Sequence, residues 1–291
     1  MSNLEPGDIL EYVTTTKSRL DVTYSGYVEF DPVFEVCNKE YPIMHNAIAI
    51  ETDDKSFFKS LSLNGAPTFK KENTPEKGFF RYVFTDKDRE IEKDVNFVSP
   101  FLQYPFVKFQ VIYSNSDQIK GALIGEKGEL KSSFTREELA LKAWEDYDQV
   151  GNALMGRTYT VQAFINMCWA ELVKLGAKDL GEQQYINTAY YYLRNKVVFM
   201  REYLDDKTFA HIFASLLSQR KIKPEVLIST GNNIGQLKHV LFDQEIRYVI
   251  KVGDKLFYNV TDFSNPGEMS ETLLDNETYI IQLYGDRKSV V

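Results

Sequence analysis

Cysteine and histidine are scarce in this chain. Its 291 residues include two cysteines, Cys37 and Cys168, and three histidines. The two cysteines lie far apart and in different predicted elements, so we expect two buried thiols and no disulfide. So few Cys and His side chains exclude a Cys/His zinc site. Acidic pairs such as Asp53–Asp54 lack the ligand spacing of a calcium loop. We therefore predict no metal and no other cofactor.

Long apolar runs and clusters of basic residues are also missing. No run approaches the roughly 20 apolar residues of a membrane-spanning helix, and no charged start followed by an apolar stretch indicates a signal peptide. The net charge is −8, and lysine and arginine form no block. Nucleic acid is therefore not an expected partner, because binding it requires clustered cations.

Aromatic residues, by contrast, are abundant at 14% of the chain, which favours β-rich structure. Short runs of β-branched and aromatic residues, separated by turn residues, occur at 8–16, 47–52, 57–63, 79–85 and 107–115. Short strands at this spacing predict an antiparallel β-sandwich over residues 1–117. A polar, glycine-containing segment at 118–133 is the predicted linker.

Helical periodicity begins after the linker. Thr135 stands three residues before Glu138, which is the spacing of a capping box. Apolar residues then repeat with the helical period in the segments 135–154, 160–176, 182–197 and 207–221. A buried strand follows at 223–230, and a hairpin is predicted over 245–263 with its turn near Val252, Gly253 and Asp254. Helices followed by a small antiparallel sheet predict an α+β fold for the second domain, residues 134–291.

The order of helix, strand and hairpin from residue 185 onward resembles the transglutaminase-like fold, which is related to papain-type cysteine proteases. The segment PGDILEY, residues 6–12, looks like the start of the last part of a β-sandwich of unknown function. That sandwich commonly precedes transglutaminase-like domains in exported proteins of Gram-negative bacteria. The resemblance implies a periplasmic or cell-envelope location and a longer parent chain.

The catalytic positions of that family are replaced in this sequence. The family's helix opens with the motif Asp-Cys-Lys-Asp-Lys-Ala. With Ala210 placed on the motif's alanine, the nucleophilic cysteine falls on Asp206. The family's Asn-His pair falls on Asp243 and Gln244, and its aspartate falls on Asn259. The resemblance therefore implies a degenerate triad of Asp206, Gln244 and Asn259.

Acyl transfer by such a fold needs a thiolate, a titrating base and a group that orients the base. A carboxylate is a weak nucleophile towards an amide, and carboxamides do not titrate. Asp205 and Asp206 are instead interpreted as carboxylates that cap and stabilise a helix N-terminus. A hairpin turn at Val252–Gly253 would make Gln244 and Asn259 diagonal neighbours across two strands.

Two functions remain open from the sequence. The preferred one is a catalytically inactive module that binds a protein or peptide, or neighbouring domains of a longer cell-envelope chain. The alternative is an active hydrolase, protease or acyltransferase with a rearranged site, made of His239 with Asp205, Asp206 or Asp262. Cys168 lies mid-helix among apolar residues, so a place in the core is favoured over a role as a nucleophile.

Overall fold

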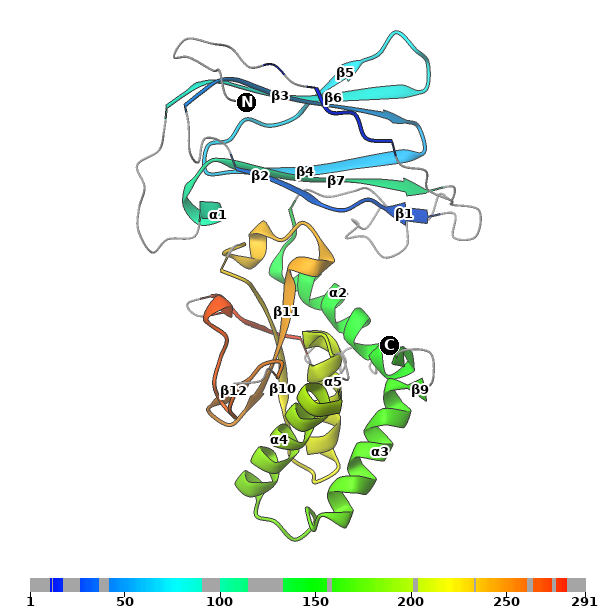
Figure 1. Cartoon of the computed structure of the whole chain (residues 1–291), viewed down its shortest axis with the longest axis vertical. Helices are drawn as coiled ribbons and strands as arrows, with labels where there is room; N and C mark the ends of the chain where they lie inside the picture. Colours follow the sequence, from blue (N-terminus) through cyan, green and yellow to red (C-terminus); the bar gives the residue numbers. More distant parts are fainter. Residues whose placement is uncertain are drawn as a thin grey trace, which may run out of the picture.

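The computed structural model describes residues 11, 13–17, 27–36, 42–90, 100–114, 133–155, 159–200, 204–232, 234–260, 264–273 and 276–281. Two units are stacked along the long axis of the molecule (Figure 1). We call residues 27–114 the β-sheet unit and residues 133–281 the α/β unit. Helices and antiparallel sheets occur together, which confirms the predicted α+β class. Cys37, Asp262 and most of the segments 6–12 and 118–133 lie outside the described residues.

The β-sheet unit contains two antiparallel sheets that face each other (Figure 1). Its elements are β1 (Tyr27–Glu29), β2 (Val33–Val36), β3 (Ile43–Asp53), β4 (Ser56–Leu63), β5 (Lys70–Asn73), β6 (Phe79–Arg89), α1 (Pro100–Gln103) and β7 (Phe106–Ser114). In one sheet, β7 pairs with β4 on one side and with β1 and β2 on the other. The second sheet has the order β3-β6-β5. The strands predicted at 47–52, 57–63, 79–85 and, as far as residue 114, 107–115 are confirmed, whereas the described residues 11 and 13–16 of the run 8–16 are not in a strand.

Aromatic side chains fill the space between these two sheets. Phe58 of β4 stacks on Tyr82 of β6 with ring centroids 4.4 Å apart. Phe69 contacts both Phe84 and Phe109. Because side chains alternate along a strand, the neighbours of Phe109 on β7 point to the opposite face. That opposite face is also buried, since it packs against the α/β unit.

The α/β unit begins with helices and ends with a small sheet. Its helices are α2 (Arg136–Asp148), α3 (Val161–Lys174), α4 (Glu182–Met200) and α5 (Asp206–Ser218), with short 3-10 turns η1 (Val150–Asn152), η2 (Leu237–His239), η3 (Asp243–Glu245) and η4 (Glu271–Leu273). Its strands are β8 (Leu154–Met155), β9 (Tyr159–Thr160), β10 (Glu225–Thr230), β11 (Ile246–Val252), β12 (Lys255–Phe257) and β13 (Tyr279–Ile280). The larger sheet is antiparallel with the order β12-β11-β10-β13. The predicted helices and the capping box at Thr135 are confirmed.

Helix α5 is the centre of the α/β core. Its apolar stripe is completely buried, as the helical period of the sequence predicts, and consists of Phe209, Ile212, Phe213, Leu216 and Leu217. One side of the helix packs on β11, and other sides contact α3 and α4 (Figure 1). This packing fixes the N-terminus of α5 beside the start of β11. Within the described ranges, no helix is both long enough and apolar enough to cross a bilayer.

Buried lysines connect the two units. Lys108 of β7 is fully buried, and its Nζ lies 2.5 Å from both the Glu245 carboxylate and the His239 carbonyl oxygen. Lys59 of β4 donates a hydrogen bond of 3.1 Å to the Leu241 carbonyl oxygen. Burial lowers the pKa of both lysines, and the Glu245 carboxylate opposes this effect. The interface therefore contains buried charge, and the ammonium groups of Lys59 and Lys108 both have hydrogen-bond partners.

Candidate functional site

A cleft of about 440 Å³ opens at the N-terminus of α5. It lies between the start of α5, the turn η3, the start of β11 and one residue of α2. The residues that line it are Asp146, Asp205, Asp206, Lys207, Asp243, Gln244, Ile246, Arg247 and Tyr248. Two of the positions predicted for the degenerate triad, Asp206 and Gln244, are thus brought to one cleft.

The two aspartates at the head of α5 have different structural roles. Asp205 is the N-cap, with extended backbone angles, and its carboxylate accepts a hydrogen bond of 2.6 Å from the Thr208 N–H. This confirms the predicted capping role of Asp205. Asp206 is the first helical residue, and its Oδ2 accepts a hydrogen bond of 2.9 Å from the Tyr248 backbone N–H. The Asp206 carboxylate therefore ties the helix to strand β11.

Burial disfavours the charged form of two carboxyl groups in the cleft, those of Asp206 and Asp243. Burial raises the pKa of Asp206, while the Tyr248 N–H and the Arg247 charge oppose the shift. Burial, and after it the Asp146 charge, raises the pKa of Asp243 to about 6. One carboxylate oxygen of Asp243 is buried and has no hydrogen-bond partner within the described part of the chain. A proton or a cationic group in this cleft would relieve both carboxylates.

Gln244 and Asn259 do not form a catalytic pair. Gln244 is exposed in η3, and its backbone carbonyl accepts a hydrogen bond of 2.6 Å from Arg247. The Asn259 amide donates a hydrogen bond of 2.7 Å to the Leu204 carbonyl oxygen, and its Oδ1 accepts one of 2.8 Å from the Val260 N–H. An ionised aspartate at position 259 could not make the first of these bonds, because it has no hydrogen to donate. Asn259 therefore braces the chain that enters α5.

The hairpin turn predicted near Val252, Gly253 and Asp254 is confirmed, but its two turn residues are Gly253 and Asp254 and not Val252 and Gly253. Val252 pairs with Lys255, so the two residues between them make the turn. Gly253, with φ of +59°, occupies the first turn position, where glycine has no steric penalty. Gln244 precedes β11 and Asn259 follows β12. The predicted diagonal pairing of these two side chains across the strands is therefore not formed.

His239 lies on a different cavity. It lines a space of about 670 Å³ together with residues that include Arg136, Lys238 and Glu277. This cavity shares no lining residue with the α5 cleft. Burial, and after it the Lys238 charge, lowers the pKa of His239. The alternative set of His239 with Asp205 or Asp206 is therefore not assembled, and Asp262 lies outside the described residues.

Cys168 is fully buried in α3, as its apolar neighbours in the sequence predict. Among the described residues, the α5 cleft has neither cysteine nor histidine in its lining. The same part of the chain contains no group of three or more His, Cys, Asp or Glu side chains that could hold a metal ion. Sequence reasoning did not find Asp146 and Tyr248, because α2 and β11 meet α5 only in the folded chain.

No family model matches this sequence, and no curated protein matches it. A solved crystal structure described as a "putative protease" from Parabacteroides distasonis is similar to the chain, with a TM-score of 0.42 and 11% sequence identity. The match covers 88% of this chain and 47% of that one, so this chain spans about half the length of that protein. A similarity at this level says nothing about activity.

Proposed function

We propose that this chain is a catalytically inactive relative of transglutaminase-like proteins that acts as a binding or structural module. The observation that supports this proposal is the hydrogen bond between the Asp206 carboxylate and the Tyr248 N–H. Asp206 occupies the position at the helix head where the resemblance places a nucleophilic thiol. Its carboxylate is engaged in holding two elements together.

The chemistry of the cleft agrees with the loss of acyl transfer. Such a reaction needs a strong nucleophile and a base that carries a proton near neutral pH. Asp206 is a weak nucleophile towards an amide, and Gln244 does not titrate. Asn259 already uses its amide N–H on the Leu204 carbonyl oxygen. No nucleophile–base–orienter arrangement is therefore available from these three residues.

The charges of the cleft favour a cationic ligand. Four aspartates line it, opposed by Lys207 and Arg247. The pKa of the Asp243 carboxyl is raised to about 6. An ammonium or guanidinium group beside this carboxyl would be stabilised, because it favours the charged form. We propose that the partner is a protein or peptide that inserts a basic side chain here. The placement of this chain in a larger cell-envelope protein rests on the family resemblance alone.

A matched pair of peptides tests the proposed binding site. The first is a short capped peptide with a central lysine, and the second carries norleucine at the same position. In NMR titrations at pH 7, the lysine peptide should shift the amide signals of Arg247 and Tyr248, and the norleucine peptide should not. Asp243→Asn should weaken the lysine peptide several-fold. Equal binding of the two peptides, or an unchanged affinity in the variant, would contradict the proposal.

A further inference from the structure

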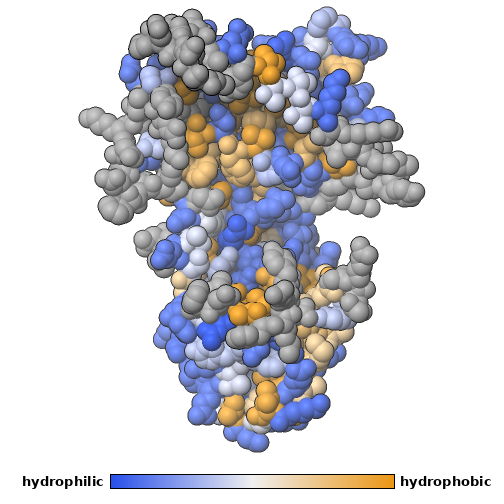
Figure 2. Space-filling view, in the orientation of Figure 1, coloured by the Kyte–Doolittle hydropathy of each residue, from blue (hydrophilic) through white to orange (hydrophobic). Residues whose placement is uncertain are grey.

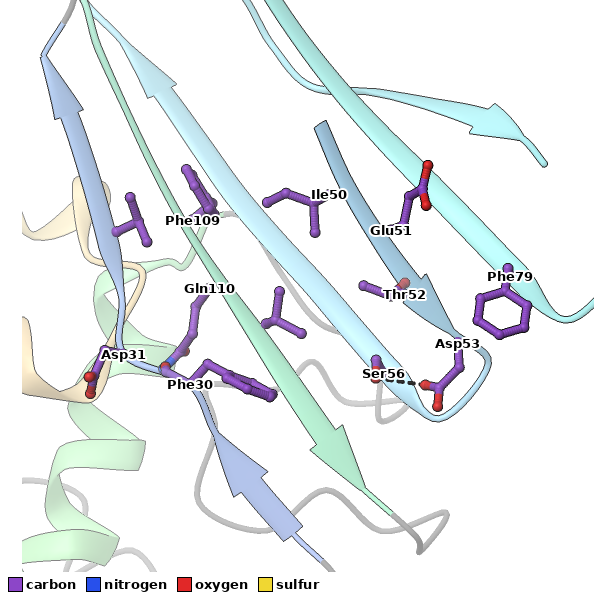
Figure 3. Close-up of a pocket in the computed structure, with 12 residues that line it drawn as sticks. Phe30, Asp31, Ile50, Glu51, Thr52, Asp53, Ser56, Phe79, Phe109 and Gln110 are labelled. Atoms are coloured by element: carbon purple, nitrogen blue, oxygen red, sulfur yellow. Dashed lines mark hydrogen bonds between the residues drawn. The ribbon is translucent and has the colours of Figure 1, made fainter. Parts of the chain in front are cut away.

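A second cleft lies between the two sheets of the β-sheet unit. It has a volume of about 450 Å³, and its walls come from β3, β7, β2 and the loop before β2 (Figure 3). Strand β3 is at the edge of its sheet, and β2 is at the edge of the facing one. The cleft therefore opens on the side of the sandwich where these two edges meet. It shares no lining residue with the α5 cleft.

The walls of this cleft are apolar. Ile50 points from β3 toward Phe109 on the facing strand β7 (Figure 3). Large apolar side chains also stand exposed around it: Phe30 at 41%, Val33 at 41% and Phe79 at 42%. Figure 2 shows apolar surface between the sheets of this unit. Single exposed apolar residues are ordinary, but several around one cavity indicate a ligand site.

Two polar atoms of residues that line the cleft, the Thr52 hydroxyl oxygen and the Gln110 amide oxygen, are buried without a hydrogen-bond partner among the described residues. Thr52 lines the cleft and is only 6% exposed. Its hydroxyl oxygen has no hydrogen-bond partner in the part of the chain that the structure describes. A buried hydroxyl without a partner costs free energy, because it has lost its bonds to water. A ligand that brings an N–H or O–H group to this wall would restore the missing bond.

Carboxylates surround the opening. Asp31, Glu51 and Asp53 line it, and none of its described lining residues is basic. Asp53 accepts a hydrogen bond of 2.7 Å from the Ser56 hydroxyl (Figure 3). The Glu51 side chain points to the other face of β3 (Figure 3), where Arg81 lies at 3.7 Å, so the charges at the opening are those of Asp31 and Asp53. An anionic head group would therefore be repelled here, and a cationic one would be attracted.

We propose that this cleft binds a small cationic amphiphile. The alkyl or aromatic body lies between the sheets against Ile50 and Phe109. The protonated amine lies at the opening beside Thr52, where Asp31 and Asp53 supply negative charge. The amine donates one hydrogen bond to the Thr52 hydroxyl oxygen, and the carboxylates stabilise its positive charge. The apolar walls supply most of the affinity, and the acidic opening supplies the selectivity for charge.

Two probes with the same alkyl chain test this proposal on the full chain. Decylamine carries a cationic head and decanoate an anionic one, and both are titrated calorimetrically at pH 7 below the concentrations at which they form micelles. We expect one decylamine per chain, bound at least about tenfold more tightly than decanoate, a ratio that corresponds to about 1.4 kcal/mol. Equal affinities, tighter binding of decanoate, or binding of neither probe would overturn the proposal.

Substitutions then locate the binding. Val33→Trp fills the cleft and should abolish decylamine binding. Met44→Trp is the matched control, because Met44 is 84% exposed on β3 and does not line the cleft. The double substitution Asp31→Asn with Asp53→Asn removes the charge at the opening and should reduce the preference for the amine about threefold to tenfold. Unchanged decylamine binding in a folded Val33→Trp variant would contradict the proposal.

Thr52→Val separates a ligand contact from a structural role. Valine has the shape of threonine and lacks the hydroxyl. If the hydroxyl is a ligand contact, decylamine binding weakens severalfold and the unfolding temperature stays the same or rises, because a buried polar group without a partner has been removed. A lower unfolding temperature with unchanged decylamine affinity would show that the hydroxyl serves the fold, and the assigned contact would be wrong.

Discussion

The Asp206 carboxylate and the Tyr248 backbone N–H are joined by a hydrogen bond of 2.9 Å, which links the head of α5 to β11. Asp206→Asn keeps an oxygen acceptor at this place and removes a charge that burial disfavours. We expect this variant to be at least as stable as the wild type at pH 7. Asp206→Ala loses the acceptor and should cost about 1–3 kcal/mol of unfolding free energy. Urea unfolding measures both, and an equal loss in the two variants would contradict this role.

Asn259 supports the same region through its bond of 2.7 Å to the Leu204 carbonyl oxygen. Asn259→Asp replaces the donor with a carboxylate that faces a carbonyl oxygen, so we expect a loss of about 1–3 kcal/mol at pH 7. The loss should shrink in acid, because a protonated carboxyl can donate a hydrogen. Chemical unfolding at pH 7 and pH 4 tests both statements. Asn152→Asp, at an exposed position, is the control, and a similar loss there would contradict the assignment.

Asp243 makes stability depend on pH. Its pKa is raised from 3.8 to about 6 in the folded chain, so the folded state binds the proton more tightly than the unfolded state does. Stability should therefore fall as the pH rises from about 4 to about 6. Asp243→Asn removes this dependence and should be more stable than the wild type at pH 7 by about 1–2 kcal/mol, allowing for partial exposure. The unfolding free energies of the two proteins are measured from pH 4 to pH 7. If both change with pH in the same way, the pKa of Asp243 is not raised and the prediction is wrong.

The interface between the units depends on a buried ion pair. Glu245→Gln leaves the Lys108 ammonium, fully buried, without its counter-charge, and should cost about 3–5 kcal/mol. Lys108→Met combined with Glu245→Gln should cost less than the sum of the single changes. Lys196→Met is the matched control, because this buried lysine pairs with Glu171 and not with Glu245. Additive losses for Lys108 and Glu245 in a double-mutant cycle would contradict this coupling.

The regular elements were predictable because their signals are local. The apolar stripe of α5 follows the helical period, and the capping box at Thr135 needs only Glu138 nearby. Asp206 and Gln244, which the resemblance places at two catalytic positions, line one cleft. The hairpin turn was predicted near the right residues, but its register was not, because Gly253 can form a turn with either neighbour.

The interface could not be predicted from local patterns. Lys59 and Lys108 alternate with apolar residues and therefore look like solvent-facing positions of two strands. In the structure, that face of the sheet is covered by the segment that includes Leu241 and Glu245. A sequence shows that a sheet has two faces, but it does not show which of them a distant segment covers. The contribution of Asp146 to the α5 cleft was missed for the same reason.

The most direct test of the central claim is a turnover assay on the α5 cleft. The protein is incubated with casein and a labelled amine donor, in the presence and absence of a thiol-alkylating reagent. Peptide release and amine incorporation are then compared for the wild type and Asp206→Ala. We predict that both proteins stay at the level of buffer under every condition. Turnover that survives alkylation and disappears in Asp206→Ala would contradict the account and identify the cleft as an active site.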